Sequence, residues 1–150
     1  MESNFIYNKY VTGKNNIGRK TQIQALTNLF AQGENVVIYE PPKTGKTSLI
    51  QQTFFNMRIQ TQKFTIVELS VLNIRTAADL VMRLGSAILK NTGTTRDDYS
   101  QAVQRYLHDS HFIFDPRYLE NQGTILSLNW DMDDDDIRAV LRLPYALGSV

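Results

Sequence analysis

The sequence predicts an α/β fold in which a parallel β-sheet is flanked by helices. Segment 35–39 is apolar without interruption after Asn35, and segment 64–69 is rich in apolar and β-branched residues. Such runs are typical of strands that are buried on both faces of a sheet. They alternate with segments whose apolar residues recur at helical spacing. Strand and helix in alternation indicate a parallel sheet with crossover helices.

The first half of the chain supplies most of this pattern. Residues 1–16 are polar and aperiodic, which indicates irregular structure. A helix is expected from Lys20, with Gly33 as its stop signal. After the strand at 35–39, a second helix is indicated by four residues that share one face, Leu49, Ile50, Phe54 and Met57.

The second half continues with helices that begin at capping signals. Thr76 with Asp79, and Thr95 with Asp98, each have the spacing of a capping box. We expect a loop over 110–122 with a short extended piece at 111–114. A half-exposed strand is expected over 124–129, and a last helix over 133–143 that Pro144 ends. No linker or repeat indicates a second domain.

Composition indicates an ordinary soluble protein of 150 residues, 42% hydrophobic and 21% charged. The net charge of +1 gives no nucleic-acid signal and no case for a membrane surface. The absence of cysteine excludes disulfides and zinc–thiolate sites. No signal peptide and no run of about 20 apolar residues is present. The expected location is the cytoplasm.

The stretch from Glu40 to Ser48, EPPKTGKTS, has the chemistry of a phosphate-binding loop. In such loops backbone N–H groups and a helix N-terminus converge on the phosphates. Lys46 is expected to reach the β and γ phosphates, and Thr47 to bind Mg²⁺. The residues expected to contact the nucleotide are Pro42, Lys43, Thr44, Gly45, Lys46, Thr47 and Ser48.

Glu40 departs from this motif, because it stands where the first glycine of the loop is expected. Its carboxylate must point away from the phosphates, since an unpaired anion beside them is unfavourable. Lys43 is one candidate partner that would neutralise it. Pro41 and Pro42 lack an N–H, but they precede the amides that do the binding.

The loop resembles the Walker A motif of AAA+ ATPases, and its Gly45–Leu49 ending, GKTSL, is similar to that of archaeal-type STAND ATPases. The segment before Lys20, Asn16–Arg19, is similar to a segment that passes beside the adenine in those ATPases. The resemblance implies a P-loop NTPase-type fold, ATP and Mg²⁺ as ligands, and Lys46 as the catalytic residue. It also makes Ile17 and Gly18 candidates for contacts to the base.

The family's Walker B strand is not evident. Segment 125–131 is interrupted by polar residues, and the acids at 131–136 are read as helix-capping groups in preference to metal ligands. We therefore expect residues 1–150 to be the incomplete N-terminal part of a P-loop ATPase domain, with the Walker B strand beyond Val150. Such a chain is expected to be inactive alone.

Other polar residues receive structural interpretations. His108 and His111 lack an evident third metal ligand, so surface positions are favoured over a metal site. Arg19 is either a phosphate sensor or a residue that supports the start of a helix. Trp130 is interpreted as a packing residue, because no basic stripe accompanies it.

The leading hypothesis is an ATP-binding module that couples ATP binding and hydrolysis to conformational work, with a protein partner or a second copy of the chain. The alternative is a non-hydrolysing nucleotide-binding switch or scaffold. A small-molecule kinase is the third class, but an arginine-rich lid is not evident.

Overall fold

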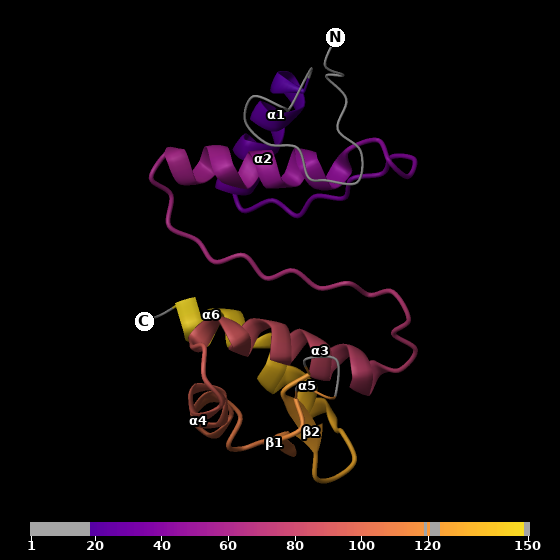
Figure 1. Cartoon of the computed structure of the whole chain (residues 1–150), viewed down its shortest axis with the longest axis vertical. Helices are drawn as coiled ribbons and strands as arrows, with labels where there is room; N and C mark the ends of the chain where they lie inside the picture. The colour runs from indigo at the N-terminus through magenta and orange to yellow at the C-terminus, as the bar shows by residue number, and fades with distance from the viewer. Residues whose placement is uncertain (1–18, 119, 121–123, 149–150) are drawn as a thin grey trace. The chain divides into compact units, whose positions relative to one another are not determined.

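The computed structural model of the protein describes residues 19–118, 120 and 124–148. The chain divides into two compact units. These are an N-terminal unit, Met1–Phe64, and a C-terminal unit, Thr65–Val150. Figure 1 draws the helices and strands of both units.

The N-terminal unit is built on two helices that pack against each other, α1 (Lys20–Ala31) and α2 (Lys46–Ile59). Both helices lie where the sequence predicts them. The N–H of Gly33, at φ +75°, donates to the carbonyl of Phe30 just after α1, so the predicted stop signal is confirmed. The buried apolar residues between the helices are Ile23, Leu26 and Leu49.

The C-terminal unit is a helical unit with one small sheet. The elements of this unit are α3 (Ala77–Leu89), the 3₁₀ helix η2 (Lys90–Thr92), α4 (Arg96–Tyr106), β1 (Phe112–Phe114), β2 (Leu126–Leu128), α5 (Asp134–Leu141) and α6 (Leu143–Gly148). Helix α3 is the central element and contacts α4, α5, α6 and β2 (Figure 1). The fully buried apolar residues at its centre include Leu89, Leu107, Ile125, Val140 and Leu143.

The predicted fold class is wrong. The structure is mostly helical, and the strands among its described residues are β1 and β2, which pair antiparallel. The parallel P-loop NTPase-type sheet with flanking helices is therefore not formed. The expected strands at 35–39 and 64–69 are outside any sheet. The two segments that do form strands, within 111–114 and 124–129, were also predicted to be extended.

The reason for the error is visible in the burial of segment 35–39. Val36 and Ile38 pack on the core of the N-terminal unit, whereas Val37 and Tyr39 are 93% and 97% exposed. An uninterrupted apolar run predicts burial on both faces, but here only alternate side chains are covered. Without a neighbouring strand to share its backbone hydrogen bonds, the segment does not enter a sheet.

Of the two predicted capping boxes, one is complete and the other is formed in part. Thr95 and Asp98 form a complete capping box at the start of α4. Thr76 accepts a hydrogen bond from the N–H of Asp79, but the Asp79 side chain binds Arg83 instead of completing a box. Pro144 does not end the last helix region, because α6 begins at Leu143 and includes it. Proline is tolerated there since the first turn of a helix needs no N–H donor.

None of the helices in the described ranges combines the length and the apolar character that a membrane crossing requires.

Burial of Leu89 predicts a large contribution to stability. Its side chain is fully buried in α3, so Leu89→Ala removes packing and leaves a cavity. We expect the free energy of unfolding of the C-terminal unit to fall by about 2–5 kcal/mol. Leu141→Ala is the matched control, because Leu141 in α5 is 62% exposed. Chemical denaturation followed by circular dichroism checks both variants, and equal losses would contradict the assigned core.

Candidate functional site

The candidate phosphate loop, residues 40–48, leads directly into α2. Gly45 is the N-cap of that helix and has φ +87°, a left-handed conformation that favours glycine. A Cβ placed on Gly45 would meet nothing within 4 Å, so the space in front of its backbone is open. The loop therefore has the glycine-dependent turn and the free approach that a phosphate group needs.

The first turn of α2 favours an anionic ligand. The N-cap residue, Gly45, has no side chain that could cap the helix, and the first turn contains no acidic residue. The first N–H groups of a helix have no partner within the helix, and the helix dipole makes this end positive. Lys46 and Thr47 are the first two residues of that turn.

The ammonium group of Lys46 folds back across the loop. Its Nζ donates to the carbonyl oxygens of Glu40 and Pro41, at 2.6 and 2.9 Å. These carbonyls are neutral acceptors, and the positive charge of Lys46 also helps to lower the pKa of the nearby Glu40 carboxyl. A phosphate oxygen that replaced a carbonyl would form a stronger, charge-assisted hydrogen bond.

Arg19, the N-cap residue of α1, links the start of the loop at Glu40 to its middle at Thr44. Its guanidinium forms three hydrogen bonds of 3.2–3.3 Å with the Glu40 carboxylate. It also donates to the carbonyl of Thr44. The Thr44 hydroxyl donates to Glu40 at 2.8 Å. The hydrogen bonds from Thr44 and Arg19 hold the pKa of Glu40 below its ordinary value.

This contact replaces the one expected from the sequence. Lys43 was the candidate partner of Glu40, but it is exposed and the carboxylate pairs with Arg19 instead. The pair joins residues 21 positions apart, and no local sequence pattern signals it. Arg19 stands at the start of α1, but its side chain makes no cap hydrogen bond to that helix and binds the loop instead.

The remaining predicted site residues follow the loop into α2. Pro42 and Thr47 are exposed, whereas Thr44 and Ser48 are half-buried. All four residues lie in loop 40–48 or in the first turn of α2, on either side of Gly45. Ile17 and Gly18, the candidates for base contacts, lie outside the described residues.

Thr47 is the predicted Mg²⁺ ligand, and its exposed position at the start of α2 fits that role. The acidic residues between positions 19 and 64 are Glu34 and Glu40, and the second is bound to Arg19. Mg²⁺ usually takes one or two protein ligands and completes its octahedron with phosphate oxygens and water. The donor set therefore fits Mg²⁺ that arrives with a triphosphate.

A second group of titratable side chains lies at the start of α5. His111, Asp133 and Asp136 have ligand atoms within 4.8 Å of one another. However, Asp133 and Asp136 form a capping box, which confirms the capping interpretation of the acidic stretch. Asp136 is 1% exposed and accepts from the N–H groups of His111 and Asp133, at 2.8 and 3.0 Å. The capping box and the contacts with His111 explain why these three side chains lie close together.

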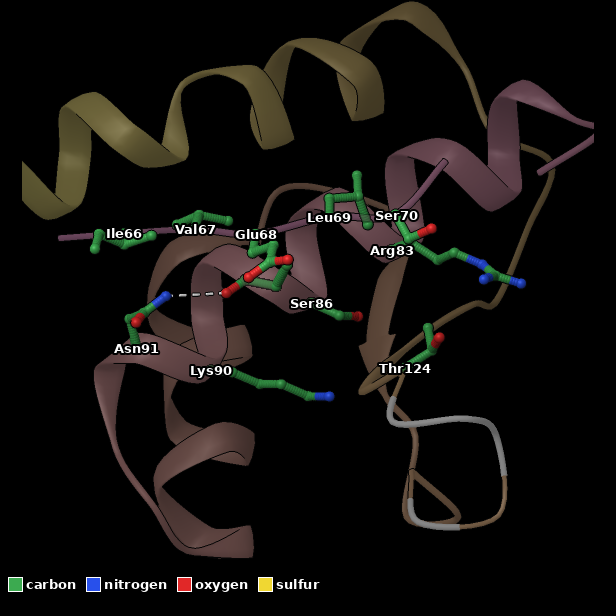
Figure 2. Close-up of a pocket in the computed structure, with 11 residues that line it drawn as sticks. Ile66, Val67, Glu68, Leu69, Ser70, Arg83, Ser86, Lys90, Asn91 and Thr124 are labelled. Carbon is green, nitrogen blue, oxygen red and sulfur yellow. Dashed lines mark hydrogen bonds between the residues drawn. The ribbon is translucent and has the colours of Figure 1, made fainter. Parts of the chain in front are cut away.

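The C-terminal unit also contains a cavity of about 410 Å³, beside segment 66–70 and the end of α3 (Figure 2). Several of its polar side chains already have partners. Arg83 binds Asp79 at 3.0 Å, Ser86 accepts from the N–H of Ile125 at 3.0 Å, and Asn91 donates to Ala87 at 3.0 Å. This cavity does not present a converging set of groups like that of the loop.

Comparison with known proteins does not assign the chain to a family. No protein-family model, curated protein or solved structure matches it.

The contact between His111 and Asp136 predicts a pH-dependent stability of the C-terminal unit. The hydrogen bond with Asp136 raises the pKa of His111 above its ordinary value of 6.5. A raised pKa gives stabilisation that is complete below pH 6.5 and is lost as the pH rises through the folded-state value. We expect the free energy of unfolding to decline over that interval, and His111→Asn to flatten the decline.

Urea denaturation at a series of pH values, followed by the fluorescence of Trp130, measures this effect, since Trp130 is the single tryptophan and lies in the C-terminal unit. His108→Asn is the matched control, because it removes the other histidine of the chain. A pH profile that His111→Asn leaves unchanged would rule out this contact as its source.

Proposed function

We propose that the protein is an ATP-binding module, with loop 40–48 as the site for the triphosphate. The observation that carries the proposal is the left-handed Gly45 at the start of α2, directly before Lys46. This arrangement supplies an open backbone turn, the positive end of a helix and a lysine at one place. The resemblance of the loop to the Walker A motif of AAA+ and STAND ATPases supports ATP as the ligand.

Each group has a stated role in the proposed complex. The N–H groups around Gly45 and in the first turn of α2 donate hydrogen bonds to the phosphate oxygens. Lys46 exchanges its backbone carbonyl partners for the β and γ phosphates. Thr47 holds Mg²⁺, which neutralises part of the charge of the phosphates. Lys43, which is exposed, adds a second cation to the loop beside the half-buried Lys46.

Binding of ATP would then be coupled to a conformational change, either as work driven by hydrolysis or as a switch without hydrolysis. A protein partner or a second copy of the chain would receive that change, and the cytoplasm would supply the nucleotide. The contacts of Glu40 favour the switch without hydrolysis. Glu40 is the acid of the loop, and Arg19 binds both of its carboxylate oxygens, so neither oxygen is left to activate a water molecule.

Replacement of Lys46 tests the site directly. Lys46→Ala removes the cation that faces the phosphates, so we expect the affinity for Mg-ATP to fall at least about tenfold, or about 1.4 kcal/mol. Isothermal titration calorimetry on the full chain measures the change. Lys63→Ala is the matched control, since Lys63 is an exposed lysine of the same unit outside the loop. Equal affinity in all three proteins would refute the proposal.

Hydrolysis is the second measurement. An attacking water must be oriented and developing charge must be stabilised. Of the two acids between positions 19 and 64, Glu40 is bound to Arg19 and Glu34 lies outside the loop. We expect phosphate release from the purified chain to stay far below about 1 per second. Turnover near that rate, abolished by Asp131→Asn, would instead identify Asp131 as a metal-binding acid.

A further inference from the structure

The Glu40 carboxylate poses a problem for any anionic ligand of the loop. It stands at the position where a phosphate-binding loop has glycine, and the carbonyl of the same residue contacts Lys46. A second anion within a few ångströms of a triphosphate is repelled, and the repulsion grows as water is excluded. A loop that binds phosphates must therefore neutralise Glu40 or lose affinity.

Arg19 provides that neutralisation in a specific geometry. Both of its terminal nitrogens, Nη1 and Nη2, bind the Glu40 carboxylate, and Nη2 also binds the Thr44 carbonyl. The Arg19 and Glu40 side chains are 22% and 25% exposed, so water screens the pair only in part. A planar guanidinium makes several such bonds at once, which a lysine at the same position does not.

The hydroxyl of Thr44 is a second partner of the Glu40 carboxylate. It donates to Oε2 of Glu40 at 2.8 Å and lies 2.8 Å from the carbonyl of Pro41. The carboxylate is thereby held by a cation from α1 and by a hydroxyl from the loop. With Glu40 paired to Arg19, Lys43 and Lys46 are the other cations of the loop, and Lys46 would exchange its carbonyl partners for phosphate.

We infer that Arg19 is a positioning residue of the nucleotide site, which makes Glu40 compatible with a bound triphosphate by neutralising its carboxylate and fixing it away from the phosphates. This inference rests on the proposed function. It differs from a phosphate-sensor role, in which Arg19 would itself contact the nucleotide. It also differs from a purely structural role, in which loss of Arg19 would harm the loop whether or not Glu40 carries a charge.

The inference predicts a strongly non-additive pair of substitutions. Arg19→Met leaves an unpaired carboxylate beside the phosphates, so the affinity for Mg-ATP should fall at least about tenfold. Glu40→Gln removes the carboxylate charge and should keep the affinity within about threefold of the wild type. The double variant has neither charge, and it should recover to within about threefold of the wild type although Arg19 is absent.

Isothermal titration calorimetry with Mg-ATP on the full chain measures the four affinities, and circular dichroism confirms that each variant is folded. Arg58→Met is the matched control, because it removes one arginine from α2 in the same unit and should leave the affinity unchanged. Recovery in the double variant supports the inference. A double variant as weak as Arg19→Met overturns it and leaves the proposed function intact. Absence of binding in the wild type overturns both.

Discussion

The left-handed turn at Gly45 is the constraint on which the N-terminal unit depends. It redirects the chain from the loop into α2, so that Leu49, four residues later, reaches the core formed with Ile23 and Leu26. The same turn places Lys46 at the start of the helix, from which its ammonium group reaches back to the carbonyl of Glu40. A residue with a Cβ would be strained there by about 1–2 kcal/mol. Fold and candidate site therefore share one backbone conformation.

In the C-terminal unit, two buried carboxylates join neighbouring elements of the fold. Asp136 ties the start of α5 to the N–H and ring of His111, just before β1. Burial alone would raise the pKa of Asp136, but hydrogen bonds from His111 and Asp133 outweigh it and lower the pKa. Asp115 likewise accepts from the Ser127 hydroxyl at 2.7 Å, which links the end of β1 to β2. Both acids are nearly inaccessible, and their partners make that burial tolerable.

The sequence was informative where structure is decided by neighbours in the chain. The capping box of Thr95 and Asp98 spans four residues, so it could be predicted from its spacing, although Thr76 and Asp79 have the same spacing and form only one of the two hydrogen bonds. The acidic start of α5 was likewise interpreted as a helix cap, which the box of Asp133 and Asp136 confirms. That segment 35–39 stays outside a sheet could not be predicted, because an apolar run does not say whether another strand will pair with it. Among the described residues no strand pairs with this segment, and the side chain of Tyr39 is exposed.

The candidate site divides in the same way. Gly45, Lys46 and Thr47 are consecutive, and their relation to the start of a helix could be predicted from the motif. The pairing of Arg19 with Glu40 could not, because it depends on how α1 lies beside the loop. Lys43 was the nearer cation in the sequence, but the fold brings Arg19 to the carboxylate instead.

The state of Glu40 also bears on what a bound nucleotide could do. A general base works best when its pKa lies near the working pH and when a lone pair faces the attacking water. The hydrogen bonds from Thr44 and Arg19 move the pKa of Glu40 in the opposite direction and occupy both carboxylate oxygens. The contacts that make Glu40 compatible with phosphate therefore make it a poor base. A site built in this way is better suited to holding ATP than to cleaving it, which favours the nucleotide-dependent switch over a self-sufficient ATPase.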